Sequence, residues 1–76
     1  MPKLPSSISG EKVVKVLIKL GYELDHQTGS HMILRQSKSP FRRITVPNHK
    51  ELAKGTLRAI IKQTGLFREE FINLIK

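Results

Sequence analysis

Two different spacings of apolar residues divide the chain into helical and extended segments. After Ser9 the apolar residues recur three and four positions apart, which is the spacing of one helix face. The residues on this face are Val13, Val14, Leu17, Ile18 and Leu20. Ser9 is a favoured N-cap residue, Glu11 places negative charge in the first turn, and Gly21 can end a helix in the left-handed conformation. The pattern predicts a helix that runs from about residue 10 to residue 20.

Three shorter segments follow in which apolar and polar residues alternate, which is the period of a strand. They are residues 22–26, 31–36 and 41–46. A turn at Thr28-Gly29-Ser30 joins the first two segments, and Pro40 interrupts the chain before the third. Pro47 ends the third segment, because proline has no N–H to donate to a neighbouring strand.

Helical spacing returns near Gly55-Thr56 and continues to Gly65. The apolar stripe of this helix consists of Leu57, Ile60, Ile61 and Leu66. A short last helix is predicted after it, with Glu69 and Glu70 in its first turn. The residues expected to face inward from this helix are Phe71, Leu74 and Ile75.

The predicted order is α-β-β-β-α with a short extra C-terminal helix, which places the chain in the α+β class. A three-stranded antiparallel sheet needs one covered face, and two amphipathic helices can cover it while the other face stays in water. Double-stranded-RNA-binding domains have this architecture, and other small α+β folds share the order. The 76 residues are enough for a single domain over residues 1–76, in which residues 1–8 are expected to form a flexible arm.

The composition excludes several kinds of chemistry and indicates a compartment. The chain has no cysteine, which excludes disulfide scaffolds, iron–sulfur clusters, zinc fingers and thiol catalysis, and which fits a reducing compartment. No apolar run exceeds three residues, as in Val16-Leu17-Ile18, which is far too short to span a membrane, and the first residues lack the apolar stretch of a signal peptide. We therefore expect a cytoplasmic protein with no membrane segment and no small-molecule cofactor.

The net charge of +8 is large for this length and is concentrated in one part of the chain. Residues 31–68 contain nine Lys and Arg residues and one acidic residue, so this segment alone has a net charge of +8. A contiguous cationic segment is typical of a surface that binds a polyanion, and nucleic acid is the first candidate. A membrane surface, an acidic protein partner and a charge that serves only solubility are the alternatives that composition leaves open.

Strand alternation places candidate functional side chains on the uncovered face of the predicted sheet. The second strand is expected to direct His31, Ile33 and Arg35 outward, and the third strand Arg43 and Thr45. The residues between them are expected in the core: Met32, Leu34, Ile44 and Val46. The open face therefore gathers a histidine and two arginines.

His31 is the candidate for chemistry, because it begins a strand beside these arginines and directly follows Gly29-Ser30. Glycine permits a positive φ and lets another chain approach the backbone closely. An imidazole can take the proton of a ribose 2′-hydroxyl or protonate a leaving oxygen near neutral pH. Arg35 and Arg43 could then stabilise the negative charge that develops at phosphorus. An ordinary surface histidine fits the same residues.

The other two histidines carry weaker signals. His49 could act as a second acid–base group, although a structural role in the loop after Pro47 is the simpler interpretation. His26 is interpreted as a solvated strand end. No pair of histidines at helical spacing and no cluster of carboxylates accompanies them, so no metal site is expected.

Lys54, Arg58 and Lys62 are spaced four residues apart and share one side of the helix predicted after Gly55-Thr56. The start of that helix is open, and helix N-termini bind phosphate groups. A solvated helix face would show the same spacing. Within the cationic segment, however, the three residues together favour contact with phosphates.

Five short motifs occur in order along the chain: Leu20-Gly21-Tyr22, Gly29-Ser30-His31, Thr45-Val46-Pro47-Asn48-His49, Glu51-Leu52 and the segment 55–66. Taken together they resemble the HicA family, the toxins of HicA–HicB toxin–antitoxin systems. The similarity runs from about Ser9 to the C-terminus. No single motif is decisive, but the Gly-Ser-His, Val-Pro-x-His and Gly-Thr-Leu-x-x-Ile motifs are specific in combination.

The resemblance implies a double-stranded-RNA-binding-like fold, metal-independent ribonuclease activity on messenger RNA, and inhibition by a HicB-type antitoxin that covers the active site. The active histidine of the family corresponds to His31. In the segment after the active histidine, family members often carry a second histidine and an aromatic residue, where this chain has Met32 and Leu34. The first departure could change the substrate preference, and the second is a conservative change in the core.

We expect the RNA-binding surface to contain Gly29, Ser30, Arg35, Arg43, Lys54, Arg58 and Lys62, with His31 as the catalytic residue. Two other functions fit the same residues. A non-catalytic RNA-binding domain shares the fold and the basic face but does not need His31. A docking surface for an acidic protein partner needs only the cations.

Overall fold

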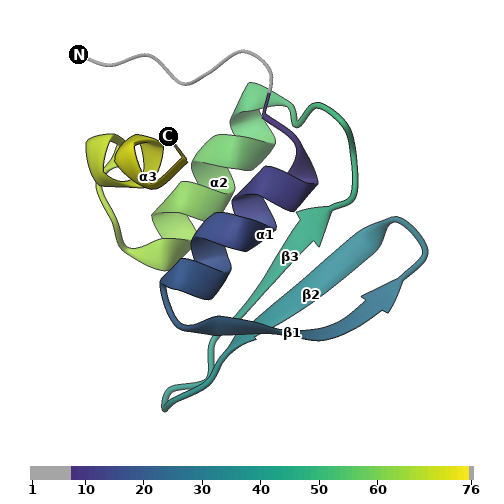
Figure 1. Ribbon diagram of the computed structural model, residues 1–76, viewed down its shortest axis with the longest axis vertical. Helices are drawn as coiled ribbons and strands as arrows, with labels where there is room; N and C mark the ends of the chain where they lie inside the picture. The colour runs from purple at the N-terminus through teal and green to yellow at the C-terminus, as the bar shows by residue number, and fades with distance from the viewer. Residues whose placement is uncertain (1–7, 76) are drawn as a thin grey trace.

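The computed structural model describes residues 8–75, which form three helices and a three-stranded sheet (Figure 1). The elements in chain order are α1 (Gly10–Lys19), β1 (Tyr22–Thr28), β2 (His31–Gln36), β3 (Arg43–Pro47), α2 (Lys54–Thr64) and α3 (Arg68–Ile75). This order confirms the predicted α+β architecture of the double-stranded-RNA-binding type, with one extra C-terminal helix. The arm expected at residues 1–8 lies outside the described residues except for Ile8, which is buried in the core.

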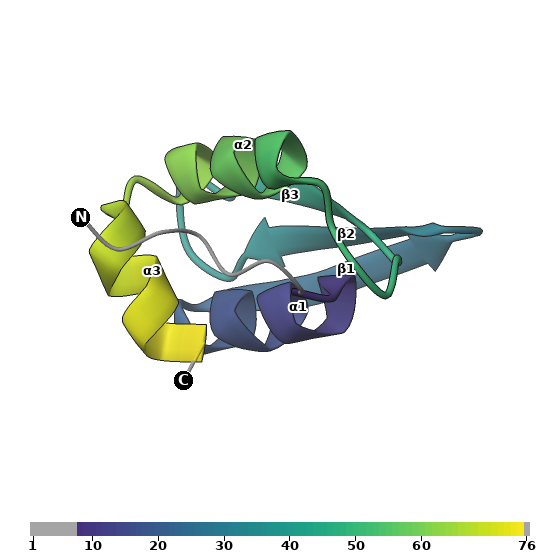
Figure 2. The ribbon, with the colours of Figure 1, turned by 90° about the horizontal axis from the view of Figure 1, so that it is seen from above.

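One face of the sheet is covered and the other is open. The strand order is β1-β2-β3 with both pairs antiparallel. Helix α1 packs against β1 and β3, α2 packs against β3, and α3 lies across one end of these two helices (Figure 2). The inward residues are buried as the alternation predicts: Met32, Leu34, Ile44 and Val46. Their neighbours along β2 and β3 therefore face solvent on the open side.

Helix α1 begins as predicted, but its buried face differs from the expected one. The Ser9 hydroxyl accepts a hydrogen bond from the backbone N–H of Lys12 at 3.2 Å, which caps the first turn. The placement of Ile18 in the core was wrong, since Ile18 is 52% exposed while Val16 is buried. These two residues lie about 200° apart around a helix, so a helix that rests on a sheet buries only one of them.

The strand boundaries shift where the backbone leaves regular geometry. Strand β1 continues two residues beyond the expected end, to Thr28, and an irregularity between Leu24 and His26 leaves Leu24 half exposed. Strand β3 begins at Arg43 rather than at residue 41, because Phe41 has a φ of 58° that no strand accommodates.

The C-terminal helices complete the core. Helix α2 ends at Gly65, whose φ is 79°, so Leu66 packs on the core from the loop and not from the helix as expected. Phe71 of α3 is fully buried as predicted, and Ile72, which periodicity did not indicate, is buried as well. Leu74 and Ile75 are half-buried.

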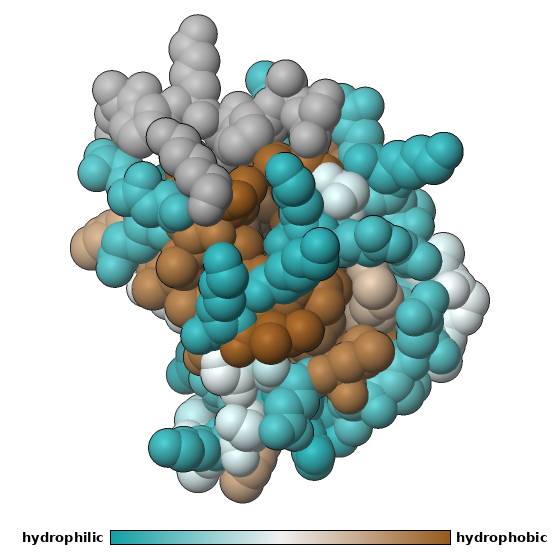
Figure 3. Space-filling model, viewed as in Figure 1, coloured by the Kyte–Doolittle hydropathy of each residue, from teal (hydrophilic) through white to brown (hydrophobic). Residues whose placement is uncertain are grey.

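On the face viewed in Figure 3, apolar side chains gather at the centre and are crossed and surrounded by hydrophilic ones. Within residues 8–75 no helix is long and apolar enough to cross a membrane.

Candidate functional site

His31 occupies the first position of β2, where a two-residue turn enters the strand. It pairs with Thr28 of β1 on one side and with Pro47 of β3 on the other. Its side chain is exposed, as alternation with the buried Met32 predicts. The turn before it needs Gly29, whose φ is 51°, because other residues are strained in that left-handed region. The strand end therefore presents an accessible imidazole on a hydrogen-bonded backbone.

The loop after β3 is tied to this strand end and to the start of α1. The backbone N–H of Asn48 donates to the carbonyl of Ser30 at 2.6 Å, one residue before His31. The backbone N–H of Gly10 donates to the carbonyl of His49 at 2.9 Å. The structural role expected for His49 is thus carried by its main chain, whereas its imidazole is exposed.

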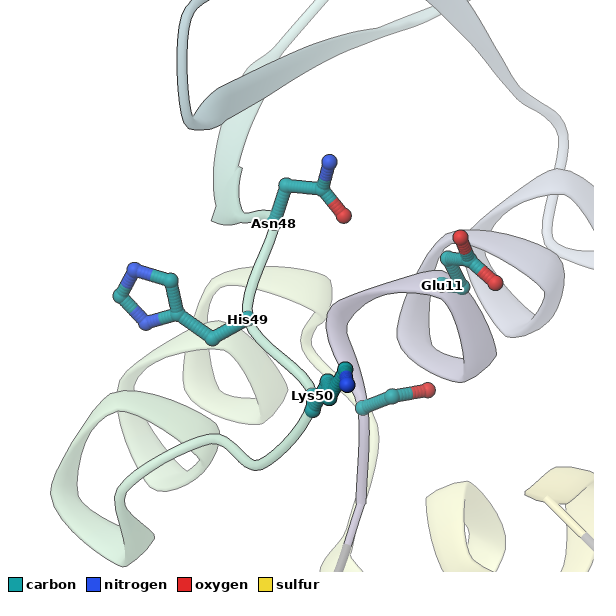
Figure 4. A pocket seen from close by; sticks show the side chains of 5 residues that line it. Glu11, Asn48, His49 and Lys50 are labelled. Carbon is teal, nitrogen blue, oxygen red and sulfur yellow. The ribbon is translucent and has the colours of Figure 1, made fainter.

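An open hollow that the sequence did not predict lies beside these contacts. It is lined by Ser9, Glu11, Asn48, His49 and Lys50 and has a volume of about 450 Å³. Figure 4 shows the Asn48 side chain directed toward the α1 side of the hollow, while the His49 ring points away from Glu11. In the sequence Glu11 indicated only a helix start. Nothing in the local pattern signals that it approaches Asn48, 37 positions further along the chain.

Two arginines on the open face lie directly opposite each other. Arg35 of β2 is the register partner of Arg43 of β3. Like charges at opposed positions of a sheet are destabilising. One acid partly compensates them, since Asp25 Oδ2 lies 3.9 Å from Arg43 Nη2 and also contacts His26 Nδ1 at 3.1 Å. The sheet thus keeps an unfavourable charge pair that an anion would relieve.

The same register separates these arginines from the histidine. Arg35 follows His31 by four residues along β2, which corresponds to roughly 13 Å of strand. The sequence-based expectation placed Arg35 and Arg43 as stabilisers of the charge that develops at the phosphorus next to the 2′-hydroxyl on which His31 acts. The backbone geometry favours contacts of these arginines with anionic groups further along a bound strand.

A second hollow joins the sheet to α2. It is lined by Arg42, Arg43, Ile44, Lys62 and Gln63 and has a volume of about 320 Å³. The structure thereby brings together two of the expected RNA-binding residues, Arg43 and Lys62, and adds Arg42, which the expectation omitted. The only signal for Arg42 in the sequence was its position beside Arg43 in the cationic segment.

Lys54 and Arg58 are exposed on α2, as predicted, but neither lines this hollow. Lys54 begins α2, eight residues or about 12 Å along the helix axis from Lys62. The cations of α2 are therefore spread along the helix and are not gathered at one point.

No group of three or more His, Asp or Glu residues that could hold a metal ion is present within residues 8–75. Of the three histidines, His26 pairs with Asp25, and no side-chain contact within the described residues joins His31 to His49.

Comparison with known proteins identifies a family for this chain. A family model described as the HicA toxin of bacterial toxin–antitoxin systems matches residues 10–66, three quarters of the chain. The matched residues include α1, the whole sheet and α2 and end before α3. A search of curated proteins gave no match.

Proposed function

Because the chain belongs to the HicA family of bacterial toxin–antitoxin toxins, we propose that it is an endoribonuclease that cuts messenger RNA through His31 without a metal ion. Membership in the family makes the chain the toxin of a pair that includes an antitoxin. The observation that supports cleavage most directly is the position of His31. Its imidazole is accessible at a strand end, on the face where the facing Arg35 and Arg43 leave positive charge in excess.

The chemistry needs a base, a nucleophile within the substrate and a leaving group. The imidazole of His31 takes the proton of a ribose 2′-hydroxyl, and the oxygen forms a bond to the adjacent phosphorus. The bond from phosphorus to the 5′-oxygen of the next nucleotide then breaks, and that oxygen takes up a proton from water or from the imidazolium. The products are a 2′,3′-cyclic phosphate, or its hydrolysis product, and a 5′-hydroxyl end. DNA lacks the nucleophile and is not cut.

The surrounding residues hold the RNA strand. Gly29 and Ser30 let the backbone approach the scissile group closely, since glycine adds no side chain there. Arg35 and Arg43 bind phosphates further along the strand, where they also relieve their mutual repulsion. The helix α2 continues this contact through Lys54, Arg58 and Lys62.

The antitoxin partner is proposed to be of the HicB type and to cover His31 and the basic open face. An acidic antitoxin surface would relieve the repulsion between Arg35 and Arg43 as an RNA phosphate does. Antitoxin and RNA substrate would then compete for one surface of the toxin. Action on messenger RNA also implies that the protein works in the cytoplasm.

A non-catalytic RNA-binding domain is the second candidate function. The facing pair Arg35 and Arg43 favours it, because anion binding by these residues does not involve His31. This function predicts RNA binding that weakens steeply with salt and that is unchanged when His31 is replaced.

One assay separates the two functions. The purified protein is incubated with messenger RNA in the presence of a chelator, beside His31→Ala and the control His26→Ala. We expect fragments with cyclic phosphate ends from the wild type and from His26→Ala, and none from His31→Ala. The fold should persist in His31→Ala, because this side chain is exposed. Cleavage by His31→Ala at the wild-type rate would refute the mechanism, and RNA binding without cleavage by the wild type would establish the binding function.

A further inference from the structure

The hollow between the start of α1 and the loop after β3 is lined by polar side chains. Its volume of about 450 Å³ is within the range of small-molecule sites, roughly 300–1,000 Å³. The side chains around it are a carboxylate, an amide, an ammonium and a hydroxyl, contributed by Glu11, Asn48, Lys50 and Ser9. Within residues 8–75, neither the Glu11 carboxylate nor the Asn48 amide has a hydrogen-bond partner. Both groups are free to bind a ligand.

The hollow is joined directly to the strand end that carries His31. Asn48 donates its backbone N–H to Ser30, the residue before His31, and Pro47 is the register partner of His31. The other wall is held by the bond from the Gly10 N–H to the His49 carbonyl. The loop that lines the hollow is therefore held next to the strand end that carries His31.

The charges around the hollow distinguish a base from a phosphate. Glu11 is one of only six acidic residues in a chain with a net charge of +8, and its carboxylate repels an anion. A carboxylate is an acceptor only, so it selects a ligand that presents N–H donors. Lys50 and the amide of Asn48 line the same hollow and supply donors.

We propose that this hollow binds a guanine base of the RNA substrate and directs cleavage to the neighbouring phosphate. Guanine presents two adjacent N–H donors, at N1 and N2, which the two oxygens of Glu11 accept. The carbonyl O6 beside them accepts from Lys50 or from the amide of Asn48. The Watson–Crick edges of adenine, cytosine and uracil each lack this pair of adjacent donors. Single-stranded RNA is generally read on these edges.

This inference rests on the proposed function, but binding and cleavage test it separately. The probes are uridine-rich RNA decamers with a single guanosine, adenosine or cytidine at the centre. Cleavage is measured on the unmodified decamers. Binding is measured by fluorescence anisotropy on 2′-O-methyl versions, which lack the nucleophile and cannot be cut.

The test variant is Glu11→Gln, which keeps the size of the side chain but replaces one acceptor oxygen by a donor. The matched control is Glu69→Gln, because Glu69 is also exposed in the first turn of a helix. We expect the wild type and Glu69→Gln to cut and bind the guanosine decamer at least tenfold better than the others. Glu11→Gln should lose this preference in both cleavage and binding.

Each outcome bears on one of the two proposals. Cleavage without any preference for guanosine, or an unchanged preference in Glu11→Gln, overturns the base site and leaves the ribonuclease intact. A guanosine preference in binding that depends on Glu11, without cleavage of any decamer, supports the base site and overturns the ribonuclease. Equal loss of preference in Glu69→Gln would assign the effect to net charge and overturn the role of Glu11.

Discussion

The backbone N–H of Asn48 lies 2.6 Å from the carbonyl oxygen of Ser30, so the loop after β3 is hydrogen-bonded to the turn that leads into β2. The two residues are 18 positions apart in the sequence. Their contact holds the position of His31 relative to the loop that carries His49 and Lys50. The bond adds to the pairing of His31 with Thr28 on one side and Pro47 on the other, so this end of the hairpin is held from both neighbouring strands.

The facing arginines should bind RNA at a cost to stability. We expect Arg35→Gln to weaken RNA binding and to lower the slope of log affinity against log salt by about 1. Stability should stay the same or rise by up to about 1 kcal/mol, because the repulsion with Arg43 is removed. Salt titrations and urea unfolding measure the two effects. Lys15→Gln, an equal charge change on the exposed side of α1, is the control, and a similar loss of binding there would argue against a specific contact.

The cations of α2 should contribute unequally. Lys62 shares a hollow with Arg42 and Arg43, whereas Lys54 does not line it. We therefore expect Lys62→Ala to reduce RNA affinity several-fold more than Lys54→Ala, because three neighbouring cations act on one phosphate. Affinities measured at a single salt concentration decide this, and equal losses would show that α2 acts only through its overall charge.

Two glycines should respond to alanine in opposite directions. A Cβ on Gly10 would overlap the backbone carbonyl of Pro47, so Gly10→Ala should destabilise the protein by about 1–3 kcal/mol through overpacking. A Cβ on Gly55, inside α2, meets nothing, so Gly55→Ala should stabilise it by about 0.4–1 kcal/mol. Thermal unfolding of both variants is the measurement. A stable Gly10→Ala would mean that the start of α1 can move away from β3.

The C-terminal helix should be part of the folded unit although it lies beyond the residues that match the family. Phe71 is fully buried, so Phe71→Ala should cost about 3–5 kcal/mol. That is a large part of the roughly 5–15 kcal/mol that stabilises a typical domain.

Phe67→Ala is the matched control for this helix, because Phe67 is 77% exposed and should tolerate the change. Urea unfolding of both variants gives the comparison. Similar midpoints for the two variants would show that α3 folds independently of the core.

Local spacing in the sequence determined the kinds of elements, their order and the faces of β2 and β3. This was possible because side chains alternate in a strand and recur every 3.6 residues in a helix whatever surrounds them. His31, Arg35 and Arg43 could therefore be assigned to one open face before any contact was known. The residue types at Ser9 and Gly65 also indicated where helices begin and end, since capping depends on neighbouring residues only.

Only the tertiary structure decided which distant residues meet. Strand register set Arg35 opposite Arg43, and packing of α2 on β3 brought Lys62 beside Arg42. The placement of Glu11 and Asn48 around one hollow depends on how α1 rests on the end of the sheet. These relationships follow from the lengths of loops and the volumes of buried side chains acting over the whole chain, and no local pattern encodes them.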